Sequence, residues 1–421
     1  MLSFILNALK IVFLLGFLVF IHEGGHFIIA KMSKVKVNEF AIGFGPTIFS
    51  KVKGDTKYAL RLIPLGGFVS MEGEEERSNV EGSFSNTSIT KKIAIILAGG
   101  IVNIIFGLIV YFVLIACVGN FLTNTVDYTL DNYPAQTVGI ISGDKILSIN
   151  NKKINNPKDI NEILSTTKGD LVKLEIERNN KKIDINVKPT NIKTKDIGVY
   201  FSKSEKNTPT KISSLDENSP ASIAGLKQND IILSVNEENV NGDIYKLINL
   251  IQNTDKEEIV IKVERENKIL DFRIIPNSID NYYLGVVFKQ AENTLSNKIY
   301  YGIIETGNFV CSIFDNLKEM FTGKVSANQM VGIVGISDIV VKTSGIYEYF
   351  YMLALISLSL GLTNLLPFPP LDGGKFVIYL IEAIRKKPMA EKIEVQLQMI
   401  GFAILIALSI YVTYNDILRI I

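Results

Sequence analysis

Four long apolar segments determine what this chain can fold into. Charge-free windows cover residues 93–126, 349–371 and 395–415, and another apolar segment runs from Phe4 to Ala30. At about 1.5 Å per helical residue, each can cross the roughly 30 Å hydrocarbon core of a bilayer. The first segment lacks a basic start and a small-residue cleavage site, so we interpret it as a retained span and not as a secretion signal. The sequence therefore predicts four transmembrane helices.

Charged residues between these segments predict their orientation. The loop over residues 31–92 is rich in Lys and Arg, and so is the loop that begins at Lys375. The positive-inside rule makes both loops cytoplasmic, which places both termini and the polar stretch from about 121 to 290 outside. A net charge of +1 gives no indication of a nucleic-acid partner, whereas membrane lipids are expected contacts.

A charged pentad interrupts the first apolar segment. The chain has only two histidines, and they stand four residues apart in His22-Glu23-Gly24-Gly25-His26. On a helix this spacing puts both imidazoles on one face, where they can bind one Zn²⁺ while Glu23 acts as general base. The alternative is a chance match with buried structural histidines, but ionisable groups inside a span are costly without a function.

A third ligand is available at the same membrane depth. Asp372 follows the third span, which enters from outside and ends near the cytoplasmic side, as the first span does at His22 and His26. A catalytic zinc ion has three protein ligands and one open position for water. We therefore expect His22, His26 and Asp372 to bind one zinc ion per chain.

Two further features of the membrane segments have open interpretations. Asn103 lies among small residues in the second span, where it either supports helix packing or faces the zinc site. The segment from Tyr58 to Met71 is β-prone and contains a Pro-Leu-Gly-Gly turn, so it forms a hairpin either at the membrane interface or on its solvent side.

The polar region contains an internal repeat. Pro134-Ala135 and Gly143-Asp144 recur 86 residues later as Pro220-Ala221 and Asn229-Asp230, and Glu177-Arg178 recurs 87 residues later as Glu264-Arg265. Two tandem copies of one domain are the simplest explanation.

Each copy resembles a bacterial PDZ domain, whose motif begins S-P-A-x-x-A-G-L-x-x-G-D-x; the second copy matches these positions from Ser219 to Ile231, with Asn229 in place of a Gly. The first copy matches less well. PDZ domains add a peptide strand to a sheet edge and bind its terminal carboxylate. By this resemblance the candidate carboxylate loops are Ile197-Gly198-Val199 and Leu284-Gly285-Val286. Ordinary strands in domains that act as steric plugs are the alternative.

These features divide the chain into five expected parts. Residues 1–120 form the first half of a membrane core, 121–203 and 204–290 the two PDZ-like domains, and 347–421 the second half of the core. Residues 291–346 connect them, with an amphipathic helix over 295–321.

The whole pattern resembles the site-2 protease family of intramembrane metalloproteases, in particular its bacterial regulator-of-sigma-factor (RseP) type. The likeness rests on His22 to His26, on Asn364-x-x-Pro-x-x-x-Leu-Asp-Gly-Gly, and on the PDZ pair between them, and it covers nearly the whole chain. It implies a multi-pass α-helical membrane protein of the bacterial inner membrane. That protein would have four transmembrane helices, a cytoplasmic-side re-entrant β-hairpin over about 57–71 and two extracytoplasmic PDZ-like α+β domains.

The resemblance also implies an activity. The expected reaction is zinc-dependent cleavage within the transmembrane segment of a single-span protein already trimmed outside, such as an anti-sigma factor or a remnant signal peptide. Gly66, Gly67 and Phe68 of the hairpin, Asn364 and Asn103 are the expected substrate-binding residues. A non-catalytic PDZ scaffold or receptor is the main alternative, and a membrane-tethered protease with a soluble site is another.

Overall fold

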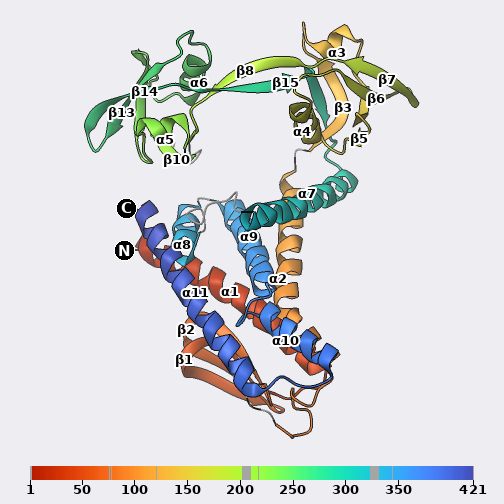
Figure 1. Ribbon diagram of the computed structural model, residues 1–421, viewed down its shortest axis with the longest axis vertical. Helices are drawn as coiled ribbons and strands as arrows, with labels where there is room; N and C mark the ends of the chain where they lie inside the picture. The colour runs from red at the N-terminus through yellow and green to blue at the C-terminus, as the bar shows by residue number, and fades with distance from the viewer. Residues whose placement is uncertain are drawn as a thin grey trace. The chain divides into compact units, whose positions relative to one another are not determined.

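The chain forms two compact units, Met1–Gly119 with Thr294–Ile421 and Asn120–Asn293, in a computed structural model (Figure 1). The structure describes residues 2–74, 76, 78–119, 121–201, 210–216, 218–322, 331–343 and 345–420.

The first unit contains the four helices that are long and apolar enough to cross a membrane. They are α1 (Leu2–Met32), α2 (Ile89–Val118), α9 (Ile346–Asn364) and α11 (Glu391–Ile420). Helix α2 packs between α1 and α9, and its glycines allow close approach: a Cβ at Gly107 would lie 2.9 Å from the Ala354 carbonyl oxygen, and one at Gly361 would lie 2.6 Å from that of Gly100. Small residues at helix contacts are the usual packing device in membranes. The prediction of a membrane protein with four spans is confirmed for the described residues.

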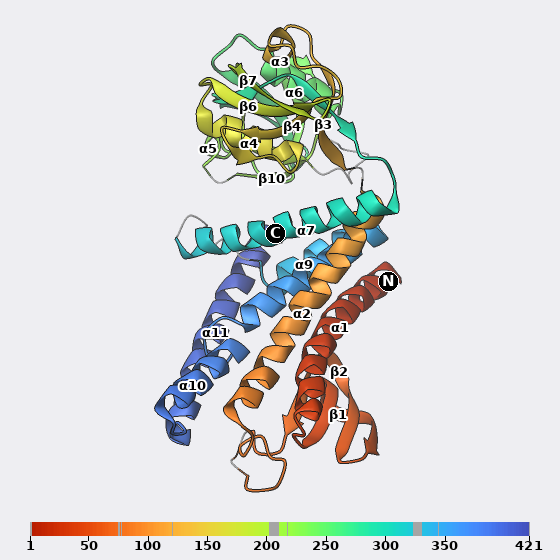
Figure 2. The same ribbon diagram turned by 90° about the vertical axis from the view of Figure 1, so that its right-hand side faces the viewer.

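Three further helices belong to this unit in the part of the chain that the structure describes. Helix α7 (Leu295–Phe321), the expected amphipathic helix, lies across the ends of α2 and α9 (Figure 2). Its Phe309 ring stacks on Tyr111 of α2 with centroids 4.1 Å apart. Helix α8 (Ile333–Lys342) is joined to α11 by Asp416, whose carboxylate accepts the backbone N–H of Gly332 and Gly335. Helix α10 (Asp372–Arg385) follows α9 and contacts α2.

The β-structure after α1 is larger than the sequence indicated. Strand β1 (Val37–Lys53) pairs with β2 (Thr56–Met71), so the predicted hairpin over 57–71 forms only one of the two strands. Both strands fold back on themselves, β1 near Gly43 and Gly45 and β2 near Gly66, and all three glycines have a positive φ. Residues 39–42 therefore lie between 57–60 on one side and 67–70 on the other. This leaves residues 67–71 as an edge segment, with no further strand beside it in the part of the chain that the structure describes.

The second unit consists of two similar α+β domains. The first has β3 (Leu122–Thr129), α3 (Pro134–Thr137), β4 (Lys145–Ile149), β5 (Lys152–Lys153), α4 (Pro157–Thr167), β6 (Val172–Arg178) and β7 (Lys181–Val187). The second has β9 (Val199–Phe201), β10 (Ile212–Leu215), α5 (Pro220–Ala224), β11 (Ile231–Val235), β12 (Glu238–Asn239), α6 (Ile244–Gln252), β13 (Ile259–Arg265) and β14 (Lys268–Ile274).

The residues that repeat between the copies stabilise equivalent sites. Arg178 donates Nε to Asp144 Oδ1 at 2.7 Å and Nη2 to the Gly139 carbonyl, and Arg265 does the same to Asp230 and Gly225. Asp144 and Asp230 are buried, so each carboxylate needs this partner. Burial alone would raise the pKa of the Asp144 carboxyl, but Arg178 and a backbone N–H hold it below its ordinary value.

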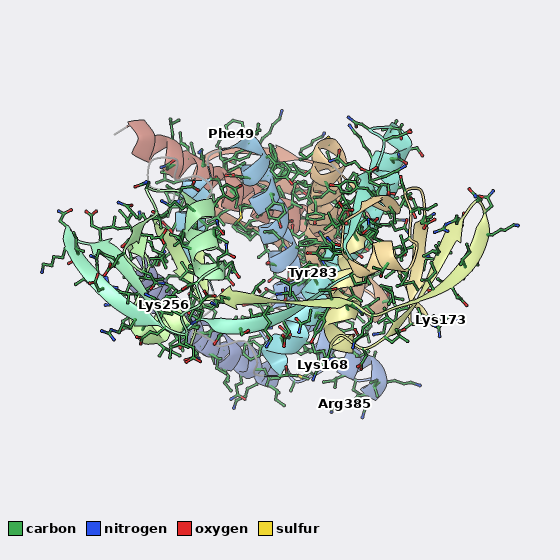
Figure 3. The ribbon with its side chains drawn as sticks, turned by 90° about the horizontal axis from the view of Figure 1, so that it is seen from above. Phe49, Lys168, Lys173, Lys256, Tyr283 and Arg385 are labelled. Carbon is green, nitrogen blue, oxygen red and sulfur yellow. The ribbon has the colours of Figure 1, made fainter. Side chains whose placement is uncertain are left out.

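The division into residues 121–203 and 204–290 needs correction, because the two copies exchange their last strands. Strand β8 (Thr190–Asp196) runs alongside β15 (Asn277–Tyr283) between the domains, and Figure 3 labels Tyr283 on this ribbon and Lys256 in the second domain. Strand β16 (Val286–Gln290) then pairs with β3 and forms the edge of the first domain's sheet, whose order is β16-β3-β4-β6-β7. The segment 277–290 therefore completes the first domain, and β9 pairs with β10 of the second.

Candidate metal centre

Three side chains from distant parts of the chain meet in the membrane unit. His22 and His26 lie one turn apart on α1, and Asp372 is the first residue of α10. The two Nε2 atoms are 3.2 Å apart, and Asp372 Oδ2 lies 3.2 Å from that of His22 and 3.3 Å from that of His26. The three side chains are only 10% to 18% exposed. The predicted ligand residues are thus brought together in a nearly equilateral triangle.

The loop before Asp372 depends on its two following glycines. A Cβ at Gly373 would lie 2.3 Å from the Leu365 and Leu366 carbonyl oxygens, and one at Gly374 would lie 2.4 Å from the Pro369 nitrogen. The Leu-Asp-Gly-Gly sequence therefore lets α10 begin tightly against the end of α9. This close packing sets the position of the carboxylate.

The triangle fits a zinc ion. Zinc bound at about 2.0–2.1 Å by tetrahedral ligands separates those ligand atoms by roughly 3.3 Å, which agrees with the distances between Nε2, Nε2 and Oδ2. Among the described residues, Asp372 Oδ2 is buried without a hydrogen-bond partner, as expected for an atom that faces a cation. Nitrogen and carboxylate donors in this number are those of a catalytic zinc site.

Helix α2 forms the wall behind the two imidazoles. His26 Nδ1 lies 2.8 Å from the Ile95 carbonyl oxygen, and His22 Nδ1 lies 3.4 Å from Asn103 Nδ2. Gly99 stands between these two contacts, and a Cβ there would come within 2.3 Å of His26 Nε2. Asn103 therefore faces the metal centre, which was one of its two predicted roles.

The edge segment of β2 lies next to Glu23. A Cβ added at Gly67 would contact Glu23 Cγ at 3.5 Å and the Ala41 carbonyl oxygen at 2.8 Å, so a glycine is needed for this approach. The neighbouring Phe68 ring lies under the Arg61 guanidinium at 4.9 Å. The predicted base and the predicted substrate-binding segment are therefore adjacent.

A charged pair that the sequence did not reveal supports this sheet. Arg61 Nη2 donates to Glu39 Oε1 at 2.7 Å, and Lys57 lies 3.4 Å from the other carboxylate oxygen. Burial would raise the pKa of Glu39, but hydrogen bonds and charge from Arg61 and Lys57 hold it below its ordinary value. Lys57 and Arg61 are four residues apart on β2, and this even spacing was the signal that could have indicated a shared sheet face.

A second ion pair joins the end of β2 to α10. Lys375 Nζ lies 2.9 Å from Glu74 Oε1. Burial lowers the pKa of Lys375, but the Glu74 carboxylate outweighs this effect and raises it above the ordinary value. The pair links the sheet to the helix that begins with Asp372.

Asn364 lies close to Asp372 in the sequence, but no hydrogen bond to the metal ligands is seen among the described residues. It is the last residue of α9, at the start of the loop that leads to Asp372. Within the described residues, the structure records no hydrogen bond between its side chain and the three ligands.

Each candidate carboxylate loop belongs to the opposite copy from the one that sequence order suggested. The Leu284 and Gly285 carbonyls accept the backbone N–H of Ala135 and Leu130 in the first domain. The Ile197 and Gly198 carbonyls accept those of Ala221 and Asp216 in the second domain. Val286 and Val199 begin the adjoining strands β16 and β9.

A groove of about 350 Å³ lies beside one of these loops, between α4 and β16. Its lining includes Ile160, Leu164, Leu284, Gly285, Val286 and Phe288. The groove is in the first domain, whose motif matched the PDZ pattern less well.

Sequence similarity to known proteins covers nearly the whole chain. The model of Peptidase family M50 matches residues 10–408. The chain is 27% identical over 447 residues to the regulator of sigma-W protease RasP of Bacillus subtilis, covering 99% of each chain. It is 28% identical over 456 residues to the regulator of sigma E protease of Haemophilus influenzae, covering 99% of this chain and 100% of the relative.

Two further similarities concern zinc and the polar region. The chain is 29% identical over 446 residues to the zinc metalloprotease RasP of Geobacillus kaustophilus, covering 98% of this chain and 97% of the relative. Among solved structures, the PDZ domain of HtrA3 bound to a phage-derived ligand is similar to 22% of this chain and 93% of its own, with 22% identity and a TM-score of 0.19. The family match and the full-length relatives identify the chain as a member of Peptidase family M50, the site-2 protease family, and as an intramembrane zinc metalloprotease.

Proposed function

We propose that this chain cleaves a peptide bond inside the transmembrane segment of single-span proteins that have already been trimmed outside the membrane. The observation that carries the proposal is the position of the ligand triangle: two of its three ligands stand on α1, a helix that is itself a candidate span. A substrate helix in the same bilayer can reach such a site without leaving the membrane.

His22, His26 and Asp372 would hold the zinc ion, with Glu23 as general base. The ion supplies Lewis-acid polarisation of the scissile carbonyl and a lowered pKa for attacking water. Glu23 takes a proton from that water and delivers it to the amide nitrogen of the leaving peptide, so Glu23 ends the reaction in its original protonation state. The oxyanion position is assigned to Asn364 as a proposal, supported by its place at the start of the Asp372 loop.

The edge segment 67–71 is the proposed substrate-binding strand. A peptide bond in a membrane helix is shielded, because its N–H and C=O are already bonded within the helix. An unwound substrate segment could regain these hydrogen bonds by pairing with an open sheet edge. Gly66, Gly67 and Phe68 lie at the start of this edge, and Gly67 is the residue that approaches Glu23.

We propose that the folded end of the β1–β2 sheet enters the cytoplasmic membrane interface. Large apolar side chains gather at that end with exposed surfaces, namely Phe44, Ile48, Phe49, Leu60, Leu62 and Ile63. Solvent is an unfavourable environment for such a cluster, whereas lipid is a favourable one. The termini and the PDZ-like domains would lie on the opposite side of a bacterial inner membrane, as the loop charges indicate.

The PDZ-like pair is the proposed filter for trimmed substrates. Trimming creates a new chain end, and the groove between α4 and β16 beside Gly285 has the sheet edge and apolar lining that suit such an end. The named relatives regulate sigma factors, which supports anti-sigma factors as substrates here, with remnant signal peptides as a second possibility.

Reconstitution tests this proposal. Purified chain in proteoliposomes receives a single-span protein with or without its outer domain, and mass spectrometry locates the cut. We expect a cut inside the apolar segment of the trimmed protein only. A version lacking residues 121–290 should cleave both forms. Equal cleavage of both forms by the complete chain would contradict the filter, and a cut outside the apolar segment would contradict the intramembrane site.

A further inference from the structure

The two zinc-binding histidines face two groups on α2 that are spaced to match them. Ile95 and Asn103 are two helical turns apart, with Gly99 midway. His26 contacts the Ile95 carbonyl, and His22 contacts the Asn103 amide. Each imidazole therefore presents Nε2 to Asp372 and Nδ1 to α2.

The proton positions follow from this arrangement. A neutral imidazole that binds a metal through Nε2 carries its proton on Nδ1, which is then a donor. For His26 the partner is a carbonyl oxygen at 2.8 Å, which is a suitable acceptor. For His22 the nearest amide atom is Asn103 Nδ2 at 3.4 Å, which is also a donor.

The oxygen of the Asn103 amide is mismatched as well. Its Oδ1 is buried and has no hydrogen-bond partner in the part of the chain that the structure describes, and the whole residue is 0% exposed. The two ends of an amide are distinguished only by the hydrogen bonds they make. Exchanging them places Oδ1 toward His22 Nδ1, which satisfies the buried oxygen and the imidazole proton together.

We infer that Asn103 is a positioning residue whose amide oxygen accepts the hydrogen bond donated by His22 Nδ1–H, and that this bond holds His22 in its zinc-binding tautomer. The inference rests on the proposed zinc site and replaces the expectation that Asn103 binds substrate. The backbone of Asn103 is itself fixed by α9, because Ser357 Oγ donates to its carbonyl oxygen at 2.8 Å. In a water-poor span, no solvent molecule can readily take over this acceptor role.

Loss of the Asn103 acceptor should weaken zinc binding. Removing the hydrogen-bond partner of a metal-bound histidine typically weakens metal affinity about 10-fold to 100-fold. Asn103→Leu, which has a similar branched shape but no acceptor, should fall in this range. Asn103→Asp keeps an acceptor in the same place and should bind at least as tightly as the parent, since a carboxylate is the commoner partner of such histidines.

The test is a metal titration of the full-length chain in detergent micelles. Apo protein is titrated with Co²⁺, and the visible absorption bands of the bound Co²⁺ report its ligand field. Competition with a chelator then gives the Zn²⁺ dissociation constant. Gly24→Ala is the control, because its added methyl group has nothing within 4 Å among the described residues and leaves the Asn103 amide in place; its affinity should equal the parent's. Circular dichroism confirms that each variant is folded.

The outcomes separate this inference from the zinc site on which it rests. Parental affinity in folded Asn103→Leu would overturn the inference. Weak zinc binding by Asn103→Asp would also overturn the inference, because the required group would then be the amide donor. If Asn103→Leu does not fold, the Asn103→Asp measurement alone tests the inference. If the parent binds no zinc, or if His22→Ala binds as well as the parent, the proposed site itself fails.

Discussion

Replacing Gly99 with Ala should weaken zinc binding at least 100-fold, although Ala is the better helix former. Ala is favoured over Gly in a helix interior by about 1 kcal/mol, so helix propensity alone predicts a more stable protein. The new Cβ would lie 2.3 Å from His26 Nε2 and 2.8 Å from His22 Cε1, whereas ordinary contact begins at 3.4 Å. The His26 ring must therefore move by about 1 Å, several times the roughly 0.2 Å that zinc–ligand bonds tolerate.

The assay is zinc content by elemental analysis together with chelator competition on purified Gly99→Ala protein. Gly24→Ala is the control, because it lies between the two histidines but has nothing within 4 Å of its added Cβ. We expect parental zinc binding in Gly24→Ala and a loss of at least 100-fold in Gly99→Ala, with unchanged helix content in both. One full equivalent of zinc bound to Gly99→Ala at parental affinity would refute the assignment of Nε2 as the ligand atom.

Three other substitutions test separate parts of the molecule. Asp372→Asn should lower the zinc content, and full occupancy by elemental analysis would count against Asp372 as a ligand. Asp144→Asn should destabilise the first PDZ-like domain by about 2 kcal/mol, measured by hydrogen exchange of β4 and β6, because Arg178 loses its charged partner. Since the folded pKa of Asp144 is lowered, the parent keeps this stabilisation above the ordinary carboxyl pKa and loses it as pH falls through the lowered value; an equal acid response in parent and variant would contradict this. Gly285→Val, at φ +77° with its Cβ 2.1 Å from Tyr133 Cβ, should abolish binding of peptides with a free apolar C-terminus in fluorescence anisotropy and leave zinc content unchanged.

The spans and the histidine pentad could be predicted because their signals are local. A transmembrane helix satisfies its own backbone, so a charge-free window is sufficient evidence for it. His22 and His26 share a helix face by spacing alone. Asp372 required one further step, the loop charges that set the direction of each span.

The groups on α2 that contact the two histidines could be predicted only in part. Asn103 carries a polar side chain in an apolar span, which is a visible signal. The Ile95 partner is a backbone carbonyl, which every residue has, so only the packing of α1 against α2 identifies it. Gly99 resembles any small residue at a helix contact until the imidazole positions are known.

The exchange of strands between the repeats could not be predicted, because both copies offer nearly the same partners. The loops at Gly198 and Gly285 are 87 residues apart and match equivalent sites, so sequence order assigned each to its own copy. Strand β8 causes the difference between the expected and the observed assignment. Its seven extended residues carry the chain about 23 Å from the first domain, and β15 returns beside it with residues 284–290.

The most direct test of the central claim is the Glu23→Gln variant in a purified system. The substitution keeps the shape of the side chain and removes its basicity, while His22, His26 and Asp372 remain in place. We expect one zinc ion per chain, as in the parent, and no cleavage of a trimmed single-span substrate in proteoliposomes. Proteolysis at the parental rate by zinc-loaded Glu23→Gln would contradict an intramembrane metal centre in which Glu23 is the base.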